Sequence, residues 1–230
     1  MLSIDNIHIR YGGISAVEGA TINVERGETV LLLGANGAGK SSIINAVMGL
    51  VRPSAGAIFL DGQRIDLRAP ESRGVLGVAF SPEGRRLFST MTVEENVHCG
   101  MYRRDVQERA KRYEELARMF PLLDEKRSVP GGLLSGGQQQ IVAVARSMAA
   151  RPRLLLLDEP FLGLAPVWIQ QISAAIREAR DEGATILMAE QMARPALKVA
   201  DRAYVIRSGQ IRLNAAASEL GESDLTDQYL

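Results

Sequence analysis

Cysteine and histidine are scarce in this 230-residue chain, and their scarcity excludes two kinds of site. Cys99 is the single cysteine and cannot close an internal disulfide, so we expect it to be a small core residue. His8 and His98 are the two histidines, and they offer no set of ligands at zinc spacing. The sequence therefore predicts neither a disulfide framework nor a zinc site.

Long apolar runs and net charge are also missing. No apolar run approaches the roughly 20 residues that span a bilayer, and residues 1–6 lack the basic and apolar regions of a signal peptide, so we expect a cytoplasmic chain. The 27 basic residues balance 27 acidic ones, which argues against a protein that works on nucleic acid. The hydrophobic fraction of 46% is ordinary for a large core, and we expect one domain over 1–230.

Apolar periodicity predicts an antiparallel β lobe and a helical insertion within this domain. Apolar residues alternate from Leu2 to Ile9 and again around Ile22, with a turn at Gly12 between them. A further strand precedes the turn at Asp61, so the β lobe should occupy about 1–30 and 55–75. Residues 93–120 carry helical periodicity, which predicts a helical insertion at about 85–150.

The rest of the chain alternates buried strands with helices, which predicts an α/β fold with a mostly parallel sheet. The predicted elements are strand 29–33, helix 42–50, helix 139–149, strand 154–157, helix 167–180 and strand 184–188. A hairpin of 203–206 and 210–213 should follow, and then a polar helix or tail over 216–230.

Residues 34–41 read GANGAGKS and match the phosphate-loop pattern G-x-x-x-x-G-K-[ST], directly after a buried strand and before a helix. The glycines let backbone N–H groups curl around phosphate oxygens, Lys40 reaches the outer phosphates of ATP, and Ser41 ligates Mg²⁺. The predicted nucleotide-binding residues of this segment are Gly34, Ala35, Asn36, Gly37, Ala38, Gly39, Lys40, Ser41 and Ser42.

A second apolar strand ends in two adjacent carboxylates, Asp158 and Glu159. Asp158 should hold Mg²⁺ through water, and Glu159 should polarise the water that attacks the γ-phosphate. Both motifs would equally suit a kinase, a helicase or a GTPase.

Residues 134–138, which read LSGGQ, distinguish between these classes. They precede a helix and offer a hydroxyl and bare backbone amides at its N-terminus, a second anion-binding surface. The motif, which consists of Leu134, Ser135, Gly136, Gly137 and Gln138, resembles the signature of ABC ATPases.

That resemblance implies a RecA-like P-loop core with an antiparallel β lobe and a helical insertion. In this family the signature of one subunit covers the γ-phosphate on the phosphate loop of another, so that two chains enclose two ATP molecules. Tyr11 matches the aromatic residue that stacks on adenine. The partner would be a second ABC ATPase subunit, either a copy of this chain or a related one.

Three positions depart from the general family pattern: Glu83 replaces a glutamine, Gln191 replaces the switch histidine, and Ala165 replaces an aspartate. With the segments PEGRR, TVEEN and DEPFLGLAP, these departures resemble the ATPase subunits of branched-chain amino acid importers. Gln191 can still hydrogen-bond a γ-phosphate oxygen, and Glu83 can reach Mg²⁺ or the attacking water. Arg85 and Arg86 lie where the family meets its membrane subunit, but they equally suit a solvated basic pair.

The resemblance implies an ATPase on the inner face of the membrane, docked on transmembrane permease subunits that receive cargo from a solute-binding protein. Urea or amides are alternative cargoes. An ABC ATPase acting on DNA or ribosomes is a rival, although the 93 residues between Ser41 and Ser135 leave no room for a long coiled-coil insertion. A P-loop kinase or nucleotide-binding regulator is a more distant rival.

Overall fold

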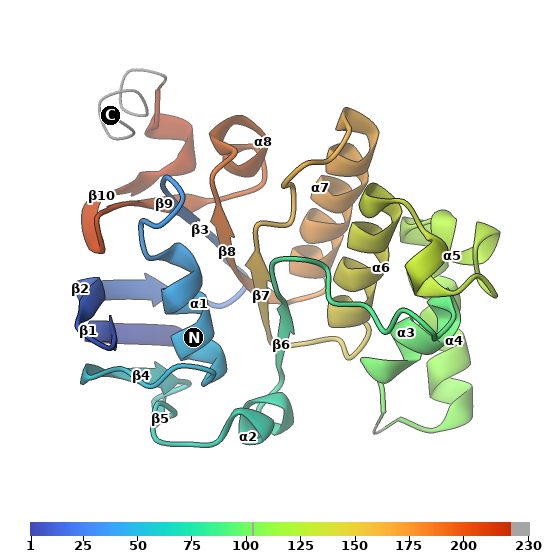
Figure 1. Ribbon diagram of the computed structural model, residues 1–230, viewed down its shortest axis with the longest axis horizontal. Helices are drawn as coiled ribbons and strands as arrows, with labels where there is room; N and C mark the ends of the chain where they lie inside the picture. Colours follow the sequence, from blue (N-terminus) through green and yellow to red (C-terminus); the bar gives the residue numbers. More distant parts are fainter. Residues whose placement is uncertain (103, 222–230) are drawn as a thin grey trace.

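Two β-sheets and a set of helices make up the computed structural model, which describes residues 1–102 and 104–221 (Figure 1). The strands are β1 (Leu2–Tyr11), β2 (Ile14–Val24), β3 (Thr29–Leu33), β4 (Ala55–Leu60), β5 (Gln63–Arg64), β6 (Val78–Ser81), β7 (Leu154–Asp158), β8 (Thr185–Glu190), β9 (Arg202–Arg207) and β10 (Gln210–Ala216). The α-helices are α1 (Lys40–Met48), α2 (Pro70–Val75), α3 (Val93–Cys99), α4 (Val106–Met119), α5 (Leu122–Glu125), α6 (Gly136–Met148), α7 (Pro166–Asp181) and α8 (Ala193–Leu197).

The six-stranded sheet has the order β10-β9-β3-β8-β7-β6 and is parallel apart from the β9–β10 hairpin. Its central strands β3, β7 and β8 are buried along their whole length, as their continuous apolar sequences predict. Leu31 and Leu33 face one core, shared with α6, α7 and α8, whereas Val30 and Leu32 face the other core, shared with α1 and the second sheet. Helices α1 and α6 therefore cover opposite faces of this sheet.

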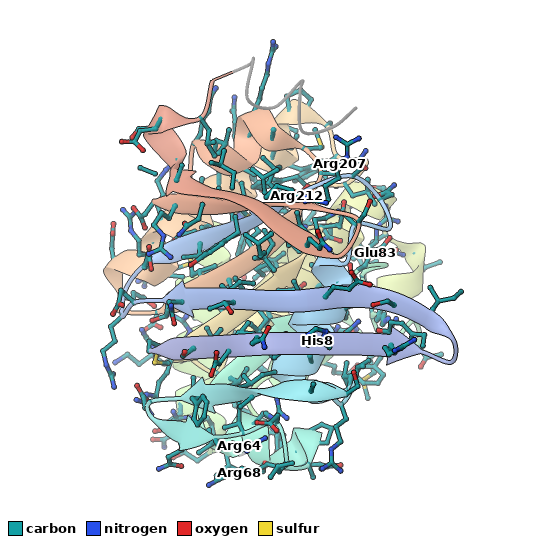
Figure 2. The ribbon with its side chains drawn as sticks, turned by 90° about the vertical axis from the view of Figure 1, so that its left-hand side faces the viewer. His8, Arg64, Arg68, Glu83, Arg207 and Arg212 are labelled. Carbon is teal, nitrogen blue, oxygen red and sulfur yellow. The ribbon has the colours of Figure 1, made fainter. Side chains whose placement is uncertain are left out.

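The second sheet is antiparallel, with the order β2-β1-β4-β5. Leu2 and Ile4 of β1 and, after an irregularity at Asn6, Ile7 and Ile9 point into the core beside α1. Figure 2 looks onto the outer face, where His8 of β1 and Arg64 of β5 are labelled. The alternation in the sequence of β1 thus corresponds to one buried and one outer face.

The segment 93–120, predicted to be helical, contains helices α3 and α4, which are separate elements. Helix α3 ends at Cys99, and α4 starts only at Val106, where the Asp105 side chain accepts from the backbone N–H of Glu108. Between them, Gly100 approaches the backbone carbonyl of Arg146 so closely that a Cβ would collide with it. Gly100 therefore packs directly against α6 where α3 ends.

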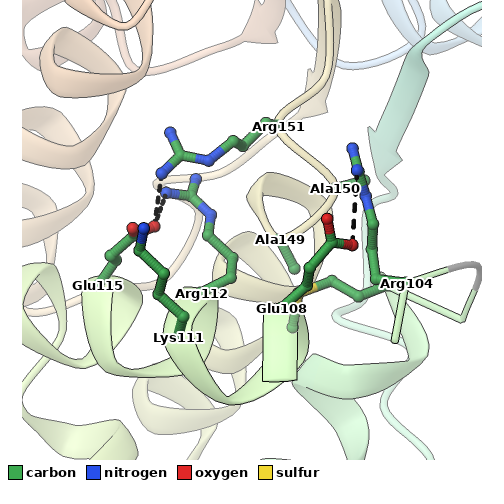
Figure 3. Close-up of a pocket in the computed structure, with 9 residues that line it drawn as sticks. Arg104, Glu108, Lys111, Arg112, Glu115, Ala149, Ala150 and Arg151 are labelled. Carbon is green, nitrogen blue, oxygen red and sulfur yellow. Dashed lines mark hydrogen bonds and ion pairs between the residues drawn. The ribbon is translucent and has the colours of Figure 1, made fainter. Parts of the chain in front are cut away.

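Ion pairs join α4 to the catalytic half of the chain, as Figure 3 shows. Arg112 of α4 and Arg151, which follows α6, both contact Glu115. The same two arginines also reach Glu182, at the end of α7. The Arg112 guanidinium is buried and donates to the carbonyl of Met148 at 3.1 Å. A network of four charged residues thus fixes the helical insertion against the core.

Three further sequence predictions need correction or completion. Cys99 is not a core residue but is half-buried at the end of α3. Ala216 belongs to β10, and a single 3₁₀ turn, Ala217–Glu219, follows it; the rest of the predicted C-terminal helix or tail, 222–230, lies outside the described residues. Strand β6 was missed because it has four residues between Gly77 and Pro82, too few to show a period.

Within the described ranges, no helix is both long and apolar enough to cross a membrane.

Candidate nucleotide site

The phosphate loop connects buried strand β3 to helix α1, as its sequence predicts. A side chain at Gly34 would collide with the carbonyl of Ile206, and one at Gly39 would lie 2.5 Å from the carbonyl of Ala16. Gly39 also has φ +106°, a conformation that glycine adopts without strain. As the N-cap of α1, Gly39 offers no side chain to the first N–H groups of the helix. These N–H groups and the helix dipole suit an anion.

Lys40, the first residue of α1, lies within this loop and is only 3% exposed. Its Nζ donates to the carbonyls of Gly34, at 2.9 Å, and Ala35, at 3.1 Å. The same Nζ forms an ion pair with Glu159 Oε1 at 3.1 Å. The fold thus brings the phosphate loop against the carboxylates that end β7.

Ser41 and Asp158 make a second link between these motifs. Ser41 Oγ donates to Asp158 Oδ1 at 2.9 Å. The pKa of Asp158 is raised to about 6, mainly by burial and also by the charges of Glu83 and Glu159, while the hydrogen bond from Ser41 and the charge of Lys40 oppose the rise. A hydroxyl and a carboxylate oxygen are the hard donors that Mg²⁺ prefers, usually with waters completing its shell.

The backbone conformation of Glu159 and the surroundings of its side chain both indicate a functional position. Its φ is +52°, a left-handed conformation that costs about 1–3 kcal/mol in a residue other than glycine. The residue is held there by its N–H, which donates to the Ala189 carbonyl at 2.9 Å. Its Oε2 is buried and accepts no hydrogen bond from the protein, so it is free to accept one from a water or to face a cation.

Glu83 and Gln191 follow strands β6 and β8, which flank β7 on either side. All three strands are parallel, so the residues after them lie at one edge of the sheet, where ligands bind in folds of this kind. Glu83 is exposed, yet its charge reaches Asp158 and raises the pKa of that group. Gln191 is half-buried beside the end of β8.

Tyr11 lies near the first turn of α1. Its ring is 47% exposed, and its hydroxyl donates to Ser42 Oγ at 3.4 Å. An exposed aromatic ring beside the phosphate loop offers a stacking surface for a base.

The signature segment caps helix α6 through a reciprocal pair of hydrogen bonds. Ser135 Oγ accepts from the N–H of Gln138 at 3.5 Å, and the Gln138 carbonyl oxygen accepts from the N–H of Ser135 at 2.9 Å. Gly136 lies against the Arg85 guanidinium, and Gly137 against the indole of Trp168. In the described part of the chain no hydrogen bond or ion pair joins 134–138 to 34–42, and the two segments serve helices on opposite faces of the sheet.

Sequence reasoning missed one residue of this site, Glu190. It ends β8 between the loops that carry Glu159 and Gln191, and it is fully buried. The available signal was an acidic residue at the end of an otherwise apolar strand, directly before Gln191.

Comparisons with known proteins agree with this geometry. The sequence pattern of the ABC transporter family matches residues 17–162. The high-affinity branched-chain amino acid transport ATP-binding protein BraG of Pseudomonas aeruginosa is 41% identical over 232 residues, covering 100% of this chain and 99% of BraG. The lipopolysaccharide export system ATP-binding protein LptB of Escherichia coli is 33% identical, covering 95% of this chain and 92% of LptB.

A solved structure of MJ1267, an ATP-binding cassette of an ABC transporter, superposes with a TM-score of 0.89 at 25% identity, covering 100% of this chain and 98% of MJ1267. MJ1267 is also known in an ADP conformation, which superposes with a TM-score of 0.85 at 25% identity, covering 99% of this chain and 93% of that chain. These likenesses confirm the predicted α/β P-loop fold and nucleotide binding. The chain belongs to the ABC transporter family and is an ATP-binding, ATP-hydrolysing subunit.

Proposed function

We propose that this ATPase powers the uptake of branched-chain amino acids, as one of two ATPase subunits docked on transmembrane permeases at the inner face of the membrane. The observation that carries the ATPase part is the pair of links between the phosphate loop and the end of β7, Lys40–Glu159 and Ser41–Asp158. The likeness to BraG over the full chain supports the choice of cargo.

ATP binds with its phosphates on the loop 34–42 and its adenine on Tyr11. Backbone N–H groups and Lys40 hold the phosphate oxygens, because the loop presents N–H groups of Gly-rich backbone at a helix N-terminus. Ser41 and Asp158 would hold Mg²⁺, and Glu83, whose charge raises the pKa of Asp158, would contribute through water. When bound, the metal neutralises charge on the β- and γ-phosphates.

Hydrolysis uses Glu159 as the general base. Its unpartnered Oε2 accepts a proton from the water whose oxygen attacks the γ-phosphorus, while the bond from phosphorus to the β,γ-bridging oxygen breaks. ADP and inorganic phosphate leave, and the proton on Glu159 returns to solvent. Gln191 donates a hydrogen bond to a γ-phosphate oxygen, without the charge that a histidine can carry.

The second anion-binding surface acts on a partner subunit. Among the described residues no hydrogen bond or ion pair joins 134–138 to the phosphate loop, while Ser135 and the amides at the start of α6 are suited to a phosphate. In the proposed assembly these residues cover the γ-phosphate bound to the other subunit. ATP therefore closes the dimer and its hydrolysis reopens it.

The test of this mechanism is Glu159→Gln. Removing the base should lower turnover by at least about 10²-fold, while Mg-ATP still binds and holds the dimer closed in size-exclusion chromatography. Glu178→Gln is the matched control, because Glu178 is exposed on α7 and touches none of the site. Hydrolysis at the wild-type rate in Glu159→Gln would refute the assignment of the base.

The cargo is tested separately, by reconstituting the chain with its copurifying membrane subunits in liposomes. Leucine, isoleucine or valine presented with the solute-binding protein should raise ATP hydrolysis and should accumulate inside the vesicles. Stimulation by urea or amides in their place would overturn the cargo and leave the ATPase mechanism intact.

A further inference from the structure

Glu190 contacts both loops that carry the proposed catalytic groups. Its Oε1 accepts from the backbone N–H of Phe161 at 2.7 Å, in the loop that begins with Glu159. Its Oε2 accepts from the N–H groups of Gln191, at 3.1 Å, and Met192, at 3.2 Å. The two oxygens of one carboxylate thus hold the loops that follow two neighbouring strands, β7 and β8.

The backbone of Glu190 reaches a third loop. Its carbonyl accepts from the N–H of Gly34, the first residue of the phosphate loop, at 3.4 Å. The neighbouring carbonyl, of Ala189, accepts from the N–H of Glu159. The end of β8 is therefore in hydrogen-bond contact with the segments that would bind phosphate, activate water and contact the γ-phosphate.

Such a carboxylate is costly where it lies. Glu190 is 0% exposed, and within the described part of the chain no ion pair involves it. Burial raises its pKa to about 7, opposed by the three N–H donors. A buried carboxylate that is bonded by backbone amides and has no ion pair in the described part of the chain contributes little net stability, because its desolvation is costly.

We propose that Glu190 is a positioning residue that fixes Glu159 and Gln191 relative to each other and to the phosphate loop. This inference rests on the proposed function. Glu190 itself would touch neither ATP nor the attacking water. It acts by holding Phe161 on one oxygen and the backbone of Gln191 on the other.

The chemistry requires a carboxylate at this position. Glutamine has nearly the same shape, but only one of its two terminal atoms accepts hydrogen bonds. Its NH₂ group would face either the Phe161 N–H or the N–H pair of Gln191 and Met192, donor against donor. One loop would be released, and its buried N–H would lose its partner. Aspartate keeps both acceptors but is one methylene too short to reach both loops.

The experiment compares Glu190→Gln with Asp66→Asn by steady-state ATPase kinetics. Asp66 is a buried carboxylate that accepts hydrogen bonds from the N–H of Ile58 and from Arg64. It belongs to the β lobe and not to the strand ends that carry the site. Glu190→Gln should lower kcat by about 10–10²-fold, because a displacement of about 1 Å at a reacting group has effects of this size. Its KM for ATP should stay within about threefold. Asp66→Asn should keep the wild-type kcat and lose only thermal stability.

Two further variants separate positioning from general damage. In a Gln191→Ala background, Glu190→Gln should cost at least about threefold less in kcat than it does alone, because part of its effect passes through Gln191. If Glu190→Gln does not fold, Glu190→Asp is measured in its place. The proposal then requires that the kcat of Glu190→Asp falls while its KM for ATP stays unchanged.

A wild-type kcat in Glu190→Gln, a change confined to KM, or full additivity with Gln191→Ala would each overturn the proposal. Failure of the proposed function is distinguishable from these results, since it would appear as undiminished turnover in Glu159→Gln.

Discussion

Gly137 in the signature helix should not tolerate even a methyl group. A Cβ built on Gly137 would lie 2.6 Å from Cδ1 and 2.7 Å from Nε1 of Trp168. Carbon atoms in contact prefer about 3.5–4.0 Å, so the indole must retreat by roughly 1 Å. Trp168 cannot retreat freely, because it belongs to the first turn of α7, where its N–H donates to the carbonyl of Ala165 at 3.0 Å.

The expected cost of Gly137→Ala is that of overpacking, about 1–3 kcal/mol. For a domain of this size a loss of 2 kcal/mol lowers Tm by about 4–8 °C. Gly136→Ala is the matched control within the same motif. A Cβ there would meet only the guanidinium of Arg85, at 2.7 Å, the far end of a flexible side chain that can move away. Alanine is also a better helix former than glycine, so Gly136→Ala should keep the wild-type Tm or exceed it.

Thermal unfolding followed by circular dichroism tests this contrast. Gly137→Ala should also be nearly neutral for Tm in a Trp168→Leu background, where the indole that would collide with the new methyl group is absent. Equal Tm values for the two alanine variants would contradict the steric reasoning. So would an undiminished cost of Gly137→Ala when Trp168 is replaced, since the backbone rather than the indole would then demand the glycine.

Two further predictions concern charge. A pKa of Glu190 raised from 4.5 to about 7 means that between these pH values the folded state holds a proton that the unfolded chain has already lost. The free energy of unfolding should therefore fall by about 3 kcal/mol as pH rises from about 4.5 to 7. Glu190→Gln should remove this pH dependence in denaturant titrations at several pH values, and an unchanged pH dependence would assign it to other groups. Arg112→Met should destabilise the protein by about 1–3 kcal/mol in the same titrations, because Glu115 and Glu182 lose a buried cation and the Met148 carbonyl keeps only the N–H of Arg151 as donor. Arg104→Met, which removes only an exposed pair with Glu108, should change stability by less than about 0.5 kcal/mol.

The parts of the fold that the sequence predicted are those with a strong local signal. Strands β3, β7 and β8 are continuous apolar runs because both faces of the sheet are covered, and the phosphate loop is recognisable because glycine is obligatory at Gly34 and Gly39. Both signals lie within a few residues of each other in the chain. The resemblance to a known family then identified the signature segment. Its glycines contact residues that lie far away in the sequence, and a local sequence pattern does not reveal such contacts.

The features that the sequence did not predict depend on contacts between distant segments. Helix α3 ends where Gly100 meets the backbone of α6, some forty residues further along the chain. The left-handed backbone of Glu159 depends on a hydrogen bond to Ala189. The role of Glu190 follows from Phe161, whose N–H lies 29 residues away in sequence. No helix or strand period encodes these relations.

The residues that lower the stability of this structure lie at one edge of the six-stranded sheet. Asp158 and Glu190 are buried carboxyls with raised pKa values, and Glu159 has a strained backbone and an unpartnered oxygen. Each costs stability, and each lies where β3, β7 and β8 end. Those strands are buried over their full length, and each fully buried leucine contributes about 1.5–3 kcal/mol. The apolar strands therefore offset the cost of their polar ends, which explains why residues this unfavourable are held in fixed positions rather than relaxed into solvent.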